Sequence, residues 1–294
     1  MLKLKTLLTS LTLGLLTTGT FAADDKAYNI VEKMDRQQRE IADGTMMRSQ
    51  LSTCKFGQKN KQITCVETPR VKVLESVSKQ YGEEKKDSKG VSILLEPASE
   101  RGIGMLTYSY DDPNKDTESW LYLSALGKVK RMASGTGEDR EPVSVFGSEF
   151  TTEDMESGTV DEYTYKILQE GPFGGREVWV IEAIPKPIRE PKTEYSKVLY
   201  WVDKERYTLL KAQAFDKRGK PFKQMLFKDI EQINGHWIAR DVTLINLQSQ
   251  RLSNMKTESI TMNVKVEDEF LTQRTLTDFA YREKTLEELR KQFQ

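Results

Sequence analysis

His236 is the only histidine in this chain, and Cys54 and Cys65 are its only cysteines. A zinc site built from histidine and cysteine side chains needs more of these ligands than the chain has, so we expect no metal site. Catalysis with a histidine base has a single candidate, and His236 directly follows the turn signal Asn234-Gly235. A histidine at that place is typical of a surface turn.

Other catalytic motifs are also missing from the sequence. The glycines of residues 171–175 lack the lysine and hydroxyl residue of a phosphate-binding loop, and those of residues 135–137 do not join a strand to a helix as in a dinucleotide-binding motif. Asp111-Asp112 and Glu153-Asp154 are adjacent carboxylates, but 45 acidic residues make such pairs uninformative. We therefore expect no enzymatic activity and no cofactor.

The first residues are typical of a secretory signal peptide. Lys3 and Lys5 precede an apolar stretch over residues 7–21, and Thr20 and Ala22 place small residues at the −3 and −1 positions of a cleavage site. The apolar stretch is shorter than the ~20 residues of a membrane span, although an N-terminal membrane anchor is the alternative. Cleavage after residue 22 leaves residues 23–294, which we expect to form one domain in the periplasm.

In an exported protein, a lone pair of cysteines is more often a disulfide than a redox centre. Cys54 and Cys65 lie on two segments separated by turn-like residues 57–61. If the turn centres between Lys59 and Asn60, the two cysteines face each other in an antiparallel hairpin, close enough for a bridge. The alternative is two free thiols.

The charges balance, with 45 Lys and Arg against 45 Asp and Glu in the full chain. Because Lys3 and Lys5 leave with the signal peptide, the mature chain has 43 basic and 45 acidic residues, a net charge of −2. A domain that neutralises phosphates carries a basic surplus, so we expect no nucleic-acid partner. Hydrophobic residues make up only 37%, but 11 Phe, 11 Tyr and 4 Trp supply bulk, which favours a sheet-rich protein.

The pattern of apolar residues predicts a mainly β fold between two helices. Residues 26–42 carry apolar residues at helical spacing, Thr285 and Glu288 have the spacing of a capping box that would begin a terminal helix, and residues 150–155 give a short helical signal. Predicted strands cover residues 46–56, 63–68, 71–81, 90–97, 103–110, 120–123, 128–132, 163–170, 177–185, 195–202, 209–215, 224–233, 237–246 and 257–266.

Short turns rather than helices join these strands, which favours one antiparallel sheet. A sheet of this many strands curls or closes, because twist accumulates and open edges invite aggregation. We therefore expect an incomplete antiparallel β-barrel, an α+β fold that is mainly β, covered or plugged by short helices.

Two predicted strands, residues 178–181 and 198–202, are apolar on both faces, which requires that a second layer cover them. Residues 255–266 instead alternate, with Ile260, Met262, Val264 and Val266 on one side and a wet face on the other. If the helices cover the sheet incompletely, an apolar cavity for acyl chains remains. The alternative is that these side chains form an ordinary core.

One block is more specific than these patterns. Residues 119–132 read Ser-Trp-Leu-Tyr-Leu-Ser-Ala-Leu-Gly-Lys-Val-Lys-Arg-Met, and residues 146–154 read Phe-Gly-Ser-Glu-Phe-Thr-Thr-Glu-Asp. The block resembles the outer-membrane lipoprotein-sorting protein family, the LolA-like periplasmic proteins. Ser124 stands where proline is usual, and Glu149 where aspartate is usual. The residues that match the motif are Gly127, Arg131, Gly147, Ser148, Phe150 and Asp154, of which the last four are expected to fix the loop and the short helix.

The resemblance implies an incomplete barrel with an apolar interior that binds lipid or the acyl chains of lipoproteins, for transport toward the outer membrane. It also implies an inner-membrane lipid exporter as partner, with only peripheral or transient contact with the membrane. We expect the cavity wall or rim to include Trp120, Tyr122, Leu123, Trp179, Tyr200, Trp201 and Met262. The alternative function is an accessory protein that carries nothing and docks on a membrane lipid transporter, and an enzyme ranks third.

Overall fold

The computed structural model describes residues 25–59, 62–132 and 142–293. The predicted signal peptide, residues 1–22, lies outside the described residues. Within these described ranges, no helix is both long and apolar enough to cross a bilayer.

A single sheet of 14 antiparallel strands dominates the described part of the chain. The strands are β1 Gly44–Lys59, β2 Gln62–Cys65, β3 Arg70–Tyr81, β4 Asp87–Glu96, β5 Gly104–Ser109, β6 Glu118–Leu123, β7 Lys128–Met132, β8 Tyr163–Phe173, β9 Arg176–Pro185, β10 Tyr195–Asp203, β11 Leu209–Asp216, β12 Pro221–Ile233, β13 His236–Asn246 and β14 Arg251–Met262.

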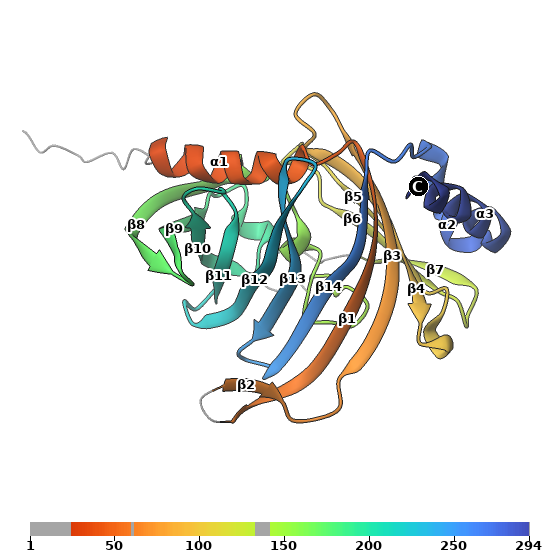
Figure 1. Ribbon diagram of the computed structural model, residues 1–294, viewed down its shortest axis with the longest axis horizontal. Helices are drawn as coiled ribbons and strands as arrows, with labels where there is room; N and C mark the ends of the chain where they lie inside the picture. The colour runs from red at the N-terminus through yellow and green to blue at the C-terminus, as the bar shows by residue number, and fades with distance from the viewer. Residues whose placement is uncertain (1–24, 60–61, 133–141, 294) are drawn as a thin grey trace, which may run out of the picture.

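The strand order is β7-β6-β5-β4-β3-β1-β14-β13-β12-β11-β10-β9-β8, and β2 pairs with β1 outside this path. Because β7 and β8 stand at opposite ends of the order, the sheet curls without closing (Figure 1). The predicted incomplete antiparallel barrel is confirmed. Tight turns explain the meander: Asn234 and Gly235 both take the positive φ that a two-residue hairpin turn requires, and they join Ile233 to its partner His236.

Helices cover both faces of the sheet. The first helix, α1 Asp25–Arg39, lies over β8 to β11, whereas α2 Gln273–Thr277 and α3 Phe279–Arg290 lie beside β3 and β4 at the other end (Figure 1). Neighbouring strand residues point to opposite faces. On β3, Val77 packs in the core formed with α2 and α3, and Ser78 faces the space under α1. We call these faces the convex and the concave face.

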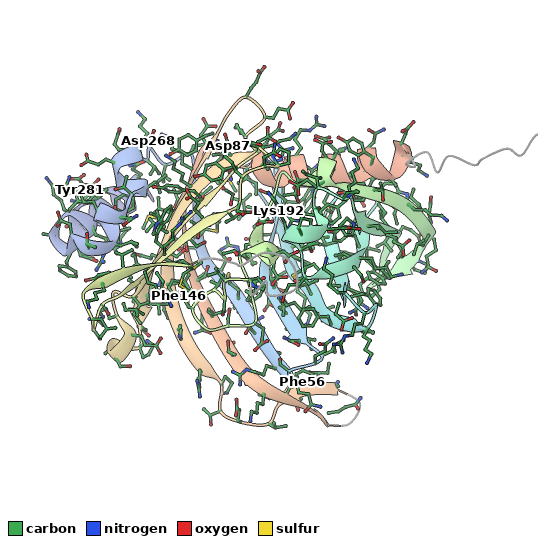
Figure 2. The ribbon with its side chains drawn as sticks, turned by 180° about the vertical axis from the view of Figure 1, so that it is seen from behind. Phe56, Asp87, Phe146, Lys192, Asp268 and Tyr281 are labelled. Atoms are coloured by element: carbon green, nitrogen blue, oxygen red, sulfur yellow. A yellow bond between two sulfur atoms is a disulfide. The ribbon has the colours of Figure 1, made fainter. Side chains whose placement is uncertain are left out.

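The convex core is dense. The labelled Tyr281 of α3 lies at the outer side of the sheet in the view from behind (Figure 2). Side chains from the C-terminal segment and from β1, β3, β4 and β5 meet there, and each is at most 6% exposed. The cluster contains Met46, Val77, Val91, Ile93, Leu106, Val264, Val266, Phe270, Leu271, Leu276, Leu286 and Leu289.

Two predicted boundaries are wrong near the C-terminus. The last helix α3 begins after Asp278, whose Oδ1 accepts a hydrogen bond from Tyr281 N at 3.0 Å, and Thr285 lies inside it, with its Oγ1 donating to Tyr281 O. Asp278 thus takes the capping role predicted for Thr285. The last strand ends at Met262, because Asn263 has φ +58 and turns Val264 and Val266 into the convex core.

The predicted disulfide between Cys54 and Cys65 is present. Its register differs from the prediction, since Lys59 pairs with Gln62 and Cys65 lies opposite Phe56. The hairpin centre is therefore one residue further along the chain than predicted. Cys54 and Cys65 are consequently diagonal neighbours rather than directly opposed.

Candidate binding cavity

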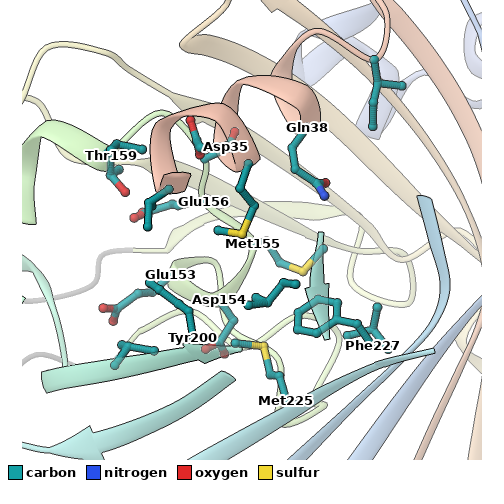
Figure 3. A pocket seen from close by; sticks show the side chains of 18 of the residues that line it. Asp35, Gln38, Glu153, Asp154, Met155, Glu156, Thr159, Tyr200, Met225 and Phe227 are labelled. Carbon is teal, nitrogen blue, oxygen red and sulfur yellow. The ribbon is translucent and has the colours of Figure 1, made fainter. Parts of the chain in front are cut away.

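A cavity of about 490 Å³ lies on the concave face, between the second half of α1, the sheet and residues 150–160. Its volume falls within the range of about 300–1,000 Å³ that is usual for small-molecule sites. Apolar side chains from α1, β1, β12 and β14 form much of the wall, among them Met34, Met47, Met225, Phe227, Met255 and Ile260. Met155, Met225 and Phe227 converge on the space in Figure 3.

The cavity exists because α1 packs closely at only one end. In its first half, Ala27 and Ile30 are buried against Ile181 and other apolar residues of β8 to β10. In its second half, Met34 and Gln38 line the cavity, although Met34 also packs against this apolar cluster. Methionine side chains are flexible and adapt to irregular shapes, so they suit the wall of an irregular cavity.

Of the seven predicted wall residues, the structure places Tyr200 at the cavity. Trp120 and Tyr122 instead lie on the convex side and pack against the convex core, where the Trp120 ring is 5.0 Å from the ring of Tyr108. Leu123 ends β6 next to the turn toward Gly127. Whether any of the seven contacts cargo stays a prediction.

The other three residues are not among those that line the cavity. Trp179 shares the concave face with α1, and its ring is 5.5 Å from the ring of Tyr207. Trp201 neighbours Tyr200 and therefore points to the convex face, where its ring is 6.1 Å from that of Phe173. Met262 ends β14, with its sulfur 3.7 Å from Asn234 Nδ2.

The motif residues divide between turns and the cavity. Gly127 and Gly147 have φ of +59 and +73, which favour glycine, and Ser148 Oγ accepts from Phe150 N at 3.2 Å. Arg131, exposed on β7, is 2.5 Å from Glu118. Phe150 and Asp154 both line the cavity, so the loop that the motif shapes also forms its floor.

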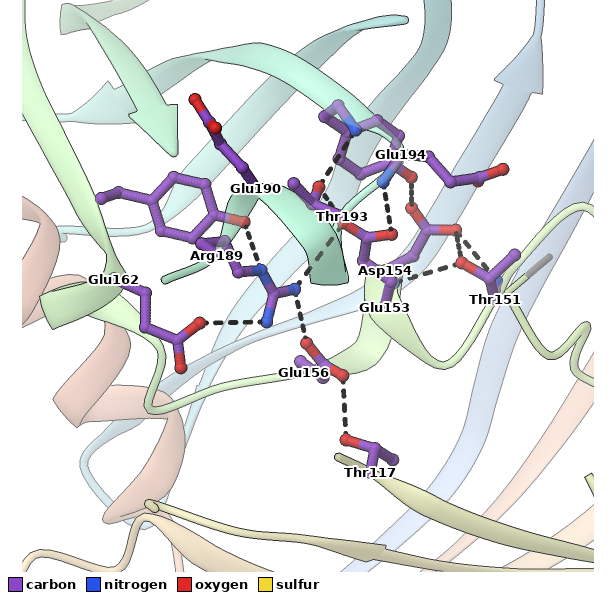
Figure 4. Close-up of polar contacts among 12 residues, drawn as sticks. Thr117, Thr151, Glu153, Asp154, Glu156, Glu162, Arg189, Glu190, Thr193 and Glu194 are labelled. Carbon is purple, nitrogen blue, oxygen red and sulfur yellow. Dashed lines mark hydrogen bonds and ion pairs between the residues drawn. The ribbon is translucent and has the colours of Figure 1, made fainter. Parts of the chain in front are cut away.

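A buried ionic group, the Arg189 cluster, borders the cavity and consists of Arg189, Glu153, Glu156 and Glu162. The guanidinium lies 2.7 Å from Glu156, 3.4 Å from Glu162 and 3.6 Å from Glu153 (Figure 4). Its side chain is only 6% exposed, and that of Glu153 only 2%. One cation thus faces three carboxylates away from bulk water.

Neighbouring hydrogen bonds hold this cluster in place. Glu153 accepts hydrogen bonds from Thr193 Oγ1 and from the Glu194 backbone N, and Glu156 Oε1 accepts one from Thr117 Oγ1 at 2.9 Å. Arg189 Nε donates to Tyr163 Oη at 3.0 Å. These bonds fix the geometry of a loop that has little regular structure.

A second buried pair lies beside the cluster. Lys223 Nζ is 2.9 Å from Asp154 Oδ2, and the Tyr195 hydroxyl donates to Asp154 Oδ1 at 2.5 Å. Burial raises the pKa of Tyr195 well above its ordinary value, and the adjacent Asp154 adds to this. The tyrosine therefore stays a neutral hydrogen-bond donor.

Burial also changes the acid–base properties of the Arg189 cluster. It raises the pKa of Glu153, although Arg189 and Thr193 act in the opposite direction. The pKa of Glu162 is raised for the same first reason. For Arg189, burial opposes the charge, but Glu156, Tyr163 and Glu153 outweigh it and hold the pKa above its ordinary value. Arg189 therefore stays a cation, whereas the carboxyl groups of Glu153 and Glu162 are harder to ionise than ordinary glutamates.

The charged groups of the cavity wall are paired with groups of opposite charge. In the described part of the chain, no group of three or more His, Cys, Asp or Glu side chains is arranged to hold a metal ion. The acidic residues of the Arg189 cluster are instead bound to an arginine. Polar groups at one side of an otherwise apolar space can orient a ligand.

Sequence reasoning did not find Arg189, Glu156 or the methionines of the wall. The sequence predicts a short helical segment over residues 150–155, and Glu153 does begin a one-turn 3₁₀ helix, Glu153–Met155. Arg189 lies in the connection between β9 and β10, with no local pattern that marks it as buried. Glu153, Asp154, Glu156 and Glu162 make buried ionic contacts, but the sequence alone does not show which charged side chains of this segment turn toward the interior.

Comparisons with known proteins agree with this architecture. A family model described as "-like: Uncharacterized protein" matches residues 86–278, more than half of the chain. A search of the curated proteins gives no significant match.

Three solved structures share the fold. A DUF1329 family protein from Desulfovibrio piger is 22% identical with a TM-score of 0.74, and the match covers 86% of this chain and 99% of the other. A putative outer membrane lipoprotein-sorting protein domain from Vibrio parahaemolyticus is 23% identical with a TM-score of 0.71 and the same coverage. A LolA superfamily protein from Nitrosomonas europaea is 16% identical with a TM-score of 0.59, covering 82% of this chain and 96% of the other.

The strand order, the open barrel and the helix over its concave face are thus those of a LolA-like fold, as the block at residues 119–154 indicated. The chain belongs to the family whose model matches residues 86–278.

Proposed function

We propose that this protein is a periplasmic carrier that binds lipid or lipoprotein acyl chains in its concave cavity and moves them toward the outer membrane. The observation that carries the proposal is the cavity of about 490 Å³, with methionine and aromatic walls. Each methylene transferred from water to an apolar site is stabilised by about 0.8 kcal/mol, so such a space binds chains without reactive groups. The signal-peptide pattern of residues 1–22 supports export.

The first experiment identifies cargo. Protein purified gently from the periplasm is extracted with organic solvent, and the extract is analysed by mass spectrometry. A carrier gives a reproducible lipid species in near-stoichiometric amount. Repeatedly lipid-free preparations that also fail to bind the neutral apolar dye N-phenylnaphthylamine contradict the proposal.

A pair of variants locates the binding. Met255 lines the cavity, whereas its neighbour Lys256 is exposed and points to the other face of β14. Met255→Trp fills part of the cavity and should weaken dye binding at least fivefold, while Lys256→Trp should leave it unchanged. Equal effects of the two substitutions, in proteins with matched melting temperatures, would place the dye elsewhere.

A second candidate is the accessory protein that docks on an inner-membrane lipid exporter. Leu126 favours it, because this residue of the β6–β7 turn is 65% exposed within the motif block. Exposed apolar side chains of this kind are common at contact sites but also occur singly on ordinary surfaces. Leu126→Asp should abolish capture of the exporter and leave dye binding intact if docking is the function.

A further inference from the structure

The charges around the cavity are unequal. Five acidic residues line it, namely Asp35, Asp43, Glu153, Asp154 and Glu156, whereas Arg189 is the only lysine or arginine among its described lining residues. Three of the acids each have a cation within 3 Å. Asp35 is 2.6 Å from Arg39, Asp43 is 2.8 Å from Lys85, and Asp154 is 2.9 Å from Lys223.

The other two acids do not have a cation each. Glu153 and Glu156 share Arg189 with Glu162, so three carboxylates surround one guanidinium. Burial raises the pKa of both Glu153 and Glu162, which reduces the excess of negative charge without supplying any positive charge. Arg189 is therefore already engaged and no cation among the described lining residues is left to pair with a further anion, and burying an unpaired anion here is costly.

A second observation concerns hydrogen-bond acceptors. Gln80 lines the same cavity from β3, and its side-chain oxygen Oε1 is buried with no hydrogen-bond partner in the described structure. A buried acceptor left unpaired costs free energy, and a ligand that donates to it removes that cost. Because Gln80 and the Arg189 cluster lie on different elements, the two observations are independent.

We infer that the cavity selects amphiphiles whose polar group donates hydrogen bonds and carries no negative charge, such as an amine or an amide, over those with a carboxylate or phosphate. This inference rests on the proposed carrier function and names the class of its ligand. A cationic or neutral donor approaches the shared carboxylates without repulsion and can supply the hydrogen atom that Gln80 Oε1 lacks. An anionic head group adds a negative charge and donates no hydrogen bond to Gln80 Oε1.

The test compares three twelve-carbon probes, dodecylamine, dodecanamide and dodecanoate, below their micellar concentrations at pH 7.5. Each competes with N-phenylnaphthylamine for the wild-type protein, so all three share one readout and one chain length. We expect dodecanoate to bind at least tenfold more weakly than either of the other two. Equal or tighter binding of dodecanoate overturns the inference while leaving the carrier function intact, and failure of all three to displace bound dye overturns both.

Two variants test the cause of the selectivity. Glu156→Gln removes one carboxylate from the cavity wall and should reduce the penalty on dodecanoate several-fold. Glu190→Gln removes the same charge next to Arg189 in sequence, but from an exposed side chain outside the cavity lining, and should leave the ratio unchanged. If both variants shift the ratio equally, overall charge rather than the cavity wall causes the discrimination, and the inference fails.

Discussion

The two faces of the sheet are covered by helices in different ways. On the convex face, α2 and α3 bury Leu276 and Leu286 almost completely against the strands. On the concave face, α1 buries Ala27 and Ile30 at one end and leaves a cavity of about 490 Å³ beneath the other. The convex face therefore supplies the rigid packing that allows the concave face to remain partly empty.

The two faces of the sheet also differ in their ionic contacts. On the convex face Arg290 makes two hydrogen bonds with Glu75, Arg48 also lies 3.9 Å from this carboxylate, and the Arg290 side chain is 37% exposed. Beside the cavity, Arg189 is almost fully buried and serves three carboxylates. Glu75 thus has two cations nearby, whereas the three carboxyl groups beside the cavity depend on Arg189.

The largest effect is expected from removing that residue. Arg189→Met leaves buried carboxylates without their cation, and breaking a buried ionic group in this way costs about 3–5 kcal/mol. Arg290→Met should cost less than half as much, because Arg290 is partly exposed and Arg48 also lies 3.9 Å from Glu75. Urea unfolding of both variants measures the difference, and equal losses would contradict the contrast between the two faces.

Core truncations compare the packing of the two faces. Leu276 of α2 is fully buried in the convex core, and Leu276→Ala should lower the free energy of unfolding by about 2–5 kcal/mol. Met34→Ala, in α1 above the cavity, should lose less than half of that, since one side of Met34 already faces empty space. The midpoints of urea unfolding measure both losses of stability, provided that the slope of the unfolding free energy against urea concentration is the same in both variants as in the wild type. A larger loss of stability for Met34→Ala than for Leu276→Ala would mean that the cavity wall contributes more to stability than the convex core does.

A substitution at Gly104 tests how tightly the convex core is packed. A Cβ added there would lie 2.8 Å from Ile93 Cδ1 and from Leu276 Cδ2, so Gly104→Ala forces packed side chains apart. The expected cost is about 1–3 kcal/mol. Gly90 on β4 is the matched control, because its added Cβ would meet the nearest atom at an ordinary 3.6 Å. Gly90→Ala should be neutral or slightly stabilising. Thermal unfolding of both variants measures the difference.

The sheet could be predicted from sequence, because alternation and turn residues such as Asn234-Gly235 are local signals. The face that each strand presents could not. Trp120 and Tyr122 are aromatic residues on a half-buried strand, and nothing in their spacing tells whether α1 or the C-terminal helices will cover them. The structure places both against the convex core.

The Arg189 cluster was beyond sequence reasoning for a related physical reason. Its members lie in connections rather than in strands, and Arg189 is separated in sequence from Glu153 and Glu156 by β8 and β9. A charged loop residue is exposed by default, and only the curvature of the sheet carries these residues inward. Tyr200 could be predicted as apolar wall, but the polar side of the cavity could not.

The smallest predicted effect concerns the ionisation of Glu153, which has no counterpart among the contacts of the convex face described above. Burial raises the pKa of Glu153 in the folded protein above its ordinary value of 4.5, so the folded state holds its proton more tightly than the unfolded state does. The contribution of this group to stability is therefore most favourable below that ordinary value and falls as the pH rises toward the folded pKa. Glu153→Gln cannot ionise and escapes this loss.

The melting temperature of the variant minus that of the wild type should thus increase between pH 4.5 and pH 8, measured at several pH values in one buffer series. A difference that stays constant or falls with pH would mean that Arg189 and Thr193, rather than burial, control the carboxyl group.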